Sequence, residues 1–169
     1  MAFYFGYGSN MSKRIMKDVR SVHPSRSQSI TLKDYKIIMN MPGPNFVEPS
    51  FANIIPSKGD SVEGVLHEIT DIELKRIIAS EGTNYELIKI KVRFFNDDVI
   101  AKTLMYKTDI NSDLPISKRY KKILIKAAKE NQLSESYVTE LKNKKSVYYP
   151  FLSEFFAVRV YLWVKSRAR

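Results

Sequence analysis

Residues 4–11 read YFGYGSNM, and the rest of the chain can be ordered around this stretch. An aromatic, strand-like start runs into two glycines, and the Ser9 and Asn10 that follow are both residue types that cap helices. Apolar residues then recur at helical spacing as far as Val19. The pattern predicts a strand, a glycine turn and a helix N-terminus, whose unpaired N–H groups suit a carboxylate or phosphate. An ordinary strand–helix turn with nothing bound is the alternative.

The composition of the chain excludes several kinds of catalytic and metal-binding site. The 169 residues predict a single domain, and the absence of cysteine excludes disulfides, cysteine nucleophiles and thiolate metal sites. The only two histidines, His23 and His67, lie far apart in the sequence, which argues against a Ser–His hydrolase or a histidine-rich metal site. Structural or surface roles are favoured for both. The net charge of +10 permits anionic partners without specifying one. No secretory leader is apparent, and we expect a cytoplasmic protein.

Turn residues and hydrophobic periodicity divide the chain into further elements. Thr70 and Glu73 form a capping box that opens a helix with Ile72, Ile77 and Ile78 toward the core and Leu74 as a further candidate. Ser117 and Ser134 are expected to cap two more helices. We expect strands at 30–40, 51–55, 62–69, 85–95 and 99–106, turns at 41–45, 56–60 and 96–98, and helices at 71–80, 117–132 and 134–142.

The C-terminal segment is unusually aromatic and basic. Within this segment, residues 147–164 contain tyrosine, phenylalanine and tryptophan side chains, and lysine and arginine lie on both flanks. It is too short and too charged to predict a membrane span. We therefore divide the chain into a domain at 1–142 and an extension at 143–169 that packs on the same domain, with contact to a partner or a membrane surface as the alternative.

Glu81 is the strongest candidate for acid–base chemistry. It follows an apolar helix face and precedes Gly82, where the predicted helix gives way to a loop. A carboxylate at a helix C-terminus opposes the helix dipole, and partial burial disfavours its charge further. Such a carboxyl group could take and return a proton near neutral pH. A solvated glutamate at a helix end is the alternative.

Several segments in the same order resemble the gamma-glutamylcyclotransferase family, the AIG2-like or BtrG-like group. The YFGYGSN stretch resembles the family's glycine loop, and residues 53–56 and 59–65 match its central segment. Ser80, Glu81 and Gly82 match the catalytic region, while residues 120–137 resemble the helical pair of the animal gamma-glutamylcyclotransferases in particular. The resemblance covers about residues 3–142. The segment at 77–80 is less acidic than the family's usual run, and the tail finds no match.

The resemblance implies an α+β fold, a small mixed-sheet β-barrel with surrounding helices. It also implies an acyl transfer in which the α-amine of a γ-glutamyl group attacks its own side-chain carbonyl, expels an amine and closes 5-oxoproline. Glu81 is then the catalytic base and acid. The implied substrate-binding residues are Tyr4, Phe5, Gly6, Tyr7, Gly8, Ser9, Asn10, Tyr85 and Tyr137.

The expected partner is a small-molecule γ-glutamyl substrate, with no metal, no organic cofactor and no nucleic acid. A homodimer stays open. A γ-glutamyl amino acid is favoured as substrate, with a γ-glutamylamine or glutathione as alternatives. An alternative of another class is a non-catalytic binding module that uses the basic face of the helix at 117–132.

Overall fold

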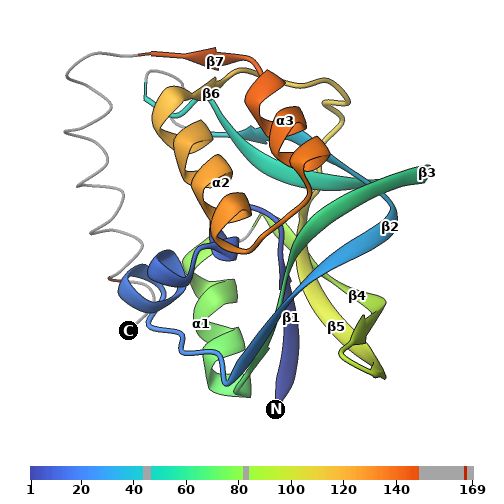
Figure 1. The fold of residues 1–169 in the computed structure, drawn as a ribbon. Coiled ribbons are helices and arrows are strands. Elements are labelled where there is room, and N and C mark those ends of the chain that lie inside the picture. The colour runs from blue at the N-terminus through green and yellow to red at the C-terminus, as the bar shows by residue number, and fades with distance from the viewer. Residues whose placement is uncertain (44–46, 82–83, 149–165, 167–169) are drawn as a thin grey trace.

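A five-stranded mixed sheet forms the centre of the molecule (Figure 1). The computed structural model describes residues 1–43, 47–81, 84–148 and 166. The strand order is β2-β3-β1-β5-β4, in which β1 runs parallel to β5 and the other neighbours are antiparallel. The strands are β1 (Ala2–Gly6), β2 (Arg26–Pro42), β3 (Ser50–Ile69), β4 (Tyr85–Phe94) and β5 (Asp97–Tyr106).

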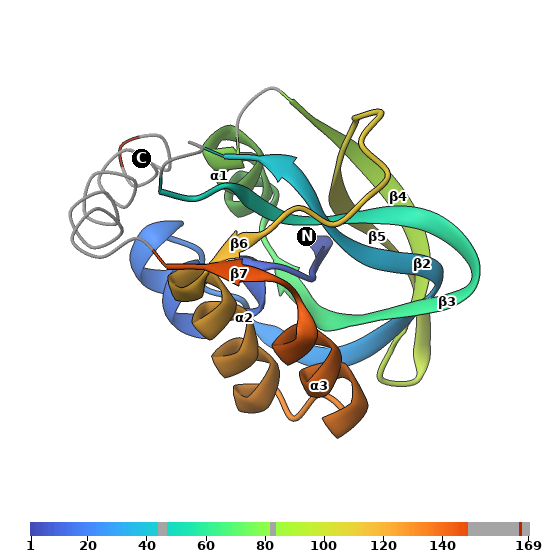
Figure 2. The same cartoon turned by 90° about the horizontal axis from the view of Figure 1, so that it is seen from above.

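The helices lie on both sides of β1 (Figures 1 and 2). They are α1 (Asp71–Glu81), α2 (Lys118–Glu130) and α3 (Glu135–Asn143), and a small parallel pair joins β6 (Ile116–Ser117) to β7 (Ser146–Val147). Side chains of β1 alternate between two cores, as a strand buried on both faces requires. Phe5 packs in the core with α2 and α3, whereas Ala2 and Tyr4 pack in the core with Leu74 and Ile77 of α1.

The expected α+β fold with a mixed sheet and surrounding helices is confirmed, and the sheet is open. Strands β2 and β4 are its two edges. The edges approach each other through side chains, because the Arg26 guanidinium lies 5.1 Å from the centre of the Phe94 ring and Gln28 accepts a hydrogen bond of 2.5 Å from the Phe95 amide. The sheet therefore curls toward a barrel without a closing ladder between these strands.

The predicted caps are present. Thr70 Oγ1 accepts a hydrogen bond of 3.2 Å from the Glu73 amide, and Glu73 Oε2 accepts one of 2.8 Å from the Thr70 amide. Ser117 and Ser134 each accept from the amide three residues later. Ile72 departs from the expected core face of α1: it is 67% exposed, because Leu74 and Ile77 define the buried stripe.

Two other expectations were wrong in their local geometry. The segment after the glycine loop is a 3-10 helix (Ser9–Met11) followed by a π-helix (Ile15–Val19), not one regular helix. The expected turn at 56–60 does not reverse the chain, because these residues bulge within the long strand β3 opposite Asp34. Positive φ angles at Asp34 and Gly59 and a 2.9 Å hydrogen bond from the Gly59 amide to Asp34 hold the bulge.

The remaining boundaries differ slightly, and part of the chain is not described. The hairpin turn between β4 and β5 lies at residues 95–96, one position before the expected turn. The last turn after α1 at Gly82 and the aromatic tail from residue 149 to 165 lie outside the described residues. The division between a domain at 1–142 and an extension thus stays a prediction.

Candidate active site

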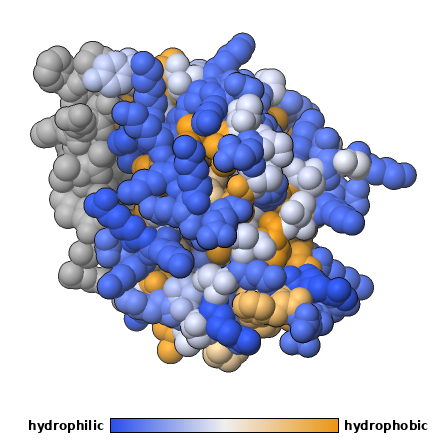
Figure 3. Space-filling view, in the orientation of Figure 1, coloured by the Kyte–Doolittle hydropathy of each residue, from blue (hydrophilic) through white to orange (hydrophobic). Residues whose placement is uncertain are grey.

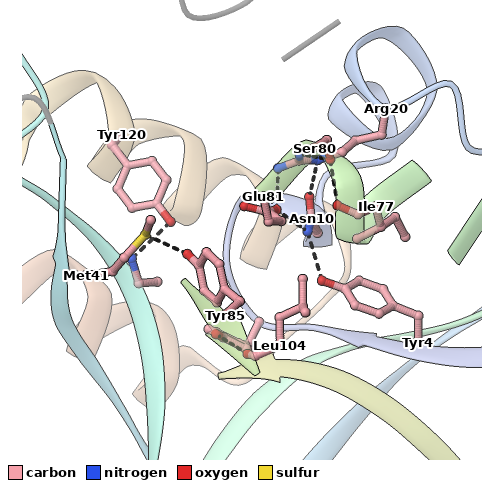
Figure 4. Close-up of polar contacts among 12 residues, drawn as sticks. Tyr4, Asn10, Arg20, Met41, Ile77, Ser80, Glu81, Tyr85, Leu104 and Tyr120 are labelled. Carbon is pink, nitrogen blue, oxygen red and sulfur yellow. Dashed lines mark hydrogen bonds and ion pairs between the residues drawn. The ribbon is translucent and has the colours of Figure 1, made fainter. Parts of the chain in front are cut away.

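Glu81 is the last residue of α1, and its carboxylate lines a large cavity. Oε1 accepts a 3.0 Å hydrogen bond from Asn10 Nδ2 and forms an ion pair with Arg20 Nη2. Within the described parts of the chain, no hydrogen bond ends on Oε2. One carboxylate oxygen is therefore fixed by two donors, Asn10 and Arg20 (Figure 4).

Arg20 organises this cluster, although the sequence pattern gave no reason to select it. The residue is 5% exposed and follows the π-helix, where its amide bonds Ile15 O at 3.1 Å. Its guanidinium donates from Nε to Asn10 Oδ1 at 2.9 Å, from Nη1 to Ser80 Oγ and from Nη2 to Glu81. A spacing of 61 residues to Glu81 carries no local signal, so only the tertiary fold reveals the contact.

Most residues of the glycine loop line the same cavity. Tyr4, Tyr7, Gly8, Ser9 and Asn10 line the cavity, as expected for a binding loop. Asn10 Nδ2 also donates to the Tyr4 hydroxyl at 2.9 Å, so the asparagine side chain bridges β1 and α1 instead of capping a helix.

Phe5 and Gly6 do not line the cavity. Phe5 is fully buried in the core on the other face of β1. Gly6 has a packing reason, since a Cβ there would lie 3.0 Å from the backbone of Asn10. Any contribution of these two residues to binding is therefore through the backbone of the loop.

The loop backbone offers unpaired donors. Met11 and Ser12 amides close the 3-10 turn on Gly8 O and Ser9 O, at 3.1 and 3.0 Å. Among the described residues, the amides of Gly8, Ser9 and Asn10 have no acceptor. The expected set of free N–H groups is thus present, but a three-residue turn adds little of the dipole that a longer helix would supply.

Tyrosines form the opposite wall of the cavity. In Figure 4, Tyr85, Tyr120 and Met41 lie across from the group formed by Asn10, Arg20 and Glu81. The Tyr85 hydroxyl donates to Met41 Sδ, and the Tyr120 hydroxyl accepts from the Ala52 amide at 3.2 Å. Burial first, and then the charge of Glu81, raises the pKa of Tyr85, so this phenol stays neutral and can donate or accept hydrogen bonds.

Tyr137 is absent from the cavity lining. It is buried in the core formed with α2 and α3. Its hydroxyl is buried with no hydrogen-bond partner in the described chain, and burial raises its pKa. The structure therefore brings Glu81, Tyr85 and most of the loop to one cavity, whereas Tyr137 lies in the core beside the cavity residues Tyr7 and Tyr120.

His67 of β3 forms a hydrogen bond with the backbone of the glycine loop. Its Nε2 donates to Asn10 O at 3.1 Å, and its Nδ1 accepts from Ser27 Oγ at 2.8 Å. Burial, the largest cause, lowers the pKa of His67 to about 4. The imidazole is thus neutral at pH 7 and acts as a structural support, in agreement with the role favoured by the sequence.

The cavity is large for a small-molecule site. Its volume is about 1260 Å³, and its lining combines the polar cluster around Glu81 with apolar surface from β3, β5 and α2. Arg14, Arg119 and Lys126 add positive charge, but each forms an ion pair with an acidic residue, at 3.6 Å for Arg14 with Asp18 and 3.7 Å for Lys126 with Glu130. Within the described residues, no cluster of three acidic or histidine side chains could hold a metal ion.

The open mixed sheet, the glycine loop and the half-buried glutamate at the end of α1 agree with the class that similarity to known proteins shows: the chain belongs to the gamma-glutamylcyclotransferase family. The model of the AIG2-like family matches residues 61–141. Membership supports an enzyme of the cyclotransferase type.

Individual relatives agree with this assignment. A gamma-glutamylcyclotransferase of Homo sapiens is 31% identical over 147 residues, which cover 82% of this chain and 76% of the relative. The gamma-glutamyl cyclotransferase gliK of Claviceps purpurea is 27% identical, with 94% of this chain and 77% of the relative covered. A solved gamma-glutamyl cyclotransferase structure superposes with a TM-score of 0.74 at 25% identity, covering 94% of this chain and 97% of that one.

Hydropathy adds one negative finding. No helix in the described part of the chain is long and apolar enough to span a bilayer.

Proposed function

We propose that the protein converts a γ-glutamyl amino acid into 5-oxoproline and the free amino acid, with Glu81 as the base and acid. The observation that carries the proposal is the carboxylate of Glu81 in the cavity, fixed through Oε1 by Arg20 and Asn10 while Oε2 has no described partner. A base held in this way is pre-organised to meet a substrate proton.

The reaction moves two protons from the substrate's α-nitrogen to the departing nitrogen. Oε2 of Glu81 takes the first proton from the α-ammonium, and the resulting amine attacks the γ-carbonyl carbon. Glu81 gives this proton to the departing nitrogen as the bond between that nitrogen and the carbonyl carbon breaks. The ring nitrogen, positively charged after attack, then loses its second proton to Glu81, and the released amine takes that proton up as its ammonium. The five-membered ring keeps the new C–N bond, so atoms and charges balance without a covalent enzyme intermediate. Because attack is intramolecular, correct positioning supplies much of the acceleration.

The loop is suited to hold the other end of the γ-glutamyl group. The free amides of Gly8, Ser9 and Asn10 could donate to the substrate's α-carboxylate. Charge-assisted hydrogen bonds from backbone amides are among the stronger polar contacts in proteins. Anchoring the carboxylate there would leave the α-ammonium, one carbon away, within reach of Glu81.

The tyrosine wall is suited to the carbonyl and the leaving group. Neutral phenols such as Tyr85 can donate a hydrogen bond to an oxygen that gains negative charge during attack. The rest of the cavity has room for a departing amino acid. Tyr137 would contribute only by supporting α2 and α3, because its side chain lies in the core.

An assay of product formation tests the proposal. The protein is incubated separately with γ-glutamyl-alanine, glutathione and γ-glutamyl-ε-lysine, and 5-oxoproline is measured. We expect the highest kcat/KM with γ-glutamyl-alanine. A preference for either other substrate would keep the reaction and change the substrate class.

The same assay separates an enzyme from a binding module. The exposed lysines of α2 could serve such a module, but they give no reason for a fixed carboxylate inside a cavity. If a γ-glutamyl compound binds in calorimetry and no 5-oxoproline forms from any of the three, the cyclotransferase proposal is wrong and the binding module takes its place.

A further inference from the structure

We infer that Arg20 is the positioning residue of the reaction: it holds Oε1 of Glu81 so that Oε2 faces the substrate. The inference rests on the proposed function of Glu81. It assigns a role to Arg20, which contacts the base Glu81 but belongs to no catalytic motif that can be recognised in the sequence.

The contacts of Arg20 use the whole guanidinium. Nε, Nη1 and Nη2 each bond a different acceptor, on Asn10, Ser80 and Glu81. The planar fork fixes the angles between these three acceptors, which the single ammonium of a lysine cannot do. Figure 4 shows the fork between the loop and the end of α1.

The acceptors are themselves held. Ser80 Oγ donates to Ile77 O at 2.7 Å, which leaves its lone pairs for Arg20. Asn10 accepts from Arg20 through Oδ1 and donates through Nδ2 to both Glu81 and Tyr4. Oε1 therefore receives two donors whose positions are set by other bonds, and the free rotation that would swap the two carboxylate oxygens is blocked.

Arg20 is also the charged neighbour of the base. The ionisable side chains that interact with Glu81 from β1, β4 and α2 are tyrosines, including Tyr4, Tyr85 and Tyr120. Burial and the Glu81 charge raise the pKa values of Tyr4 and Tyr85, and burial raises that of Tyr120, so all three are neutral over the working range. Among the described residues, the positive charge next to Glu81 comes from Arg20.

A purely structural clamp would use the same contacts, so the test must separate charge, geometry and folding. Arg20→Gln removes the charge, and Arg20→Lys keeps the charge but loses the fork. Arg26→Gln is the matched control, because Arg26 also pairs with a glutamate, Glu68 at 2.7 Å, but lies at the exposed sheet edge outside the cavity lining. Near-ultraviolet circular dichroism confirms the fold of each variant.

The three variants should differ in kcat at nearly constant KM. Arg20→Gln loses the fork that fixes Oε1 of Glu81, so it should lower kcat about a hundredfold, the size expected for a misplaced catalytic group, with KM changed by less than about threefold. Arg20→Lys keeps the charge but loses the fork, so it should also lower kcat. Arg26→Gln should match the wild type.

Two results would overturn the inference while leaving the proposed function intact. The first is a folded Arg20→Gln variant with wild-type kcat. The second is a rise in KM at unchanged kcat, which would make Arg20 a substrate-binding residue. If the wild type forms no 5-oxoproline from any substrate, the proposed function fails and this role fails with it.

A milder substitution covers the case in which Arg20→Gln does not fold. Ser80→Ala removes the acceptor of Nη1 and retains both charges and Glu81. We expect kcat to fall about fivefold to tenfold with KM unchanged, because Arg20 loses one of its three acceptors but keeps its bonds to Glu81 and Asn10. Wild-type kcat in Ser80→Ala would then contradict the positioning role.

Discussion

The side-chain amide of Asn10 donates a 3.0 Å hydrogen bond to Oε1 of Glu81, joining the glycine loop to the end of α1 across 71 residues of sequence. The same amide donates to the Tyr4 hydroxyl of β1, and the backbone carbonyl oxygen of Asn10 accepts a hydrogen bond from His67 Nε2 of β3. The loop is therefore fixed to the base by side-chain contacts, and the free amides beside Asn10 are held at a set position relative to Glu81.

Replacing Asn10 tests this link. Asn10→Ala removes one of the two donors to Oε1, and we expect kcat/KM to fall about tenfold to a hundredfold, equivalent to about 1.5–3 kcal/mol for a hydrogen bond to a charged group. Steady-state assay of 5-oxoproline measures the change. Asn143→Ala, at an exposed position at the end of α3, is the matched control. Equal activity in both variants would show that the link has no part in catalysis.

His67 should make stability depend on pH. Its pKa is lowered to about 4 in the folded protein from an ordinary 6.5, so the unfolded chain binds the proton more readily. The stability it contributes is present above pH 6.5 and is lost as the pH falls toward 4. The full loss is about 3 kcal/mol, from about 1.36 kcal/mol per pH unit.

Urea unfolding at pH 7.5 and pH 5.0 measures this loss. We expect the wild type to be less stable at pH 5.0, and His67→Gln to show a smaller difference between the two conditions. His23→Gln is the control for the loss of a histidine, because His23 is exposed. The assignment to His67 is wrong if His67→Gln keeps the full pH dependence.

Gly64 allows β3 to approach the loop closely. A Cβ at this position would lie 2.5 Å from Gly6 O and 2.7 Å from the Phe5 ring. Gly64→Ala should therefore cost about 1–3 kcal/mol of stability by overpacking. The displaced loop should also lower kcat/KM, which thermal unfolding and the product assay measure on the same sample.

Gly59→Ala provides the comparison for Gly64. Its Cβ would meet nothing within 4 Å, but the φ of +88° strains any other residue by about 1 kcal/mol. We expect lower stability with unchanged kcat/KM, since the bulge in β3 lies outside the cavity lining. If Gly64→Ala also keeps full activity, close packing behind the loop does not set the geometry of the site.

Much of the fold was predictable because its signals are local. The caps at Thr70, Ser117 and Ser134 act within four residues, so sequence spacing alone locates the start of each helix. The residues of the bulge in β3 predict a turn from sequence alone, because Pro, Ser, Gly and Asp favour both structures. The pairing with β2 that decides between them is distant in sequence.

The site was predictable only where residue type carried the signal. The position of Glu81 and the family resemblance point to Glu81 and the loop, and Glu81 and most of the loop line one cavity. Arg20 was missed because a lone arginine after an irregular helix resembles any surface cation. Its role depends on contacts that form only when β1, the π-helix and α1 pack together. Conversely, Tyr137 resembled a site residue but faces the core.

The central claim is that Glu81 moves the protons, and one substitution tests it most directly. Glu81→Gln keeps the shape of the side chain, and its amide oxygen can still accept from Arg20 and Asn10, but it cannot act as the base. We predict that 5-oxoproline formation from γ-glutamyl-alanine falls at least about a thousandfold, within the range for loss of a general acid–base group, while calorimetry shows nearly unchanged substrate binding. Turnover by Glu81→Gln at the wild-type rate would contradict the account.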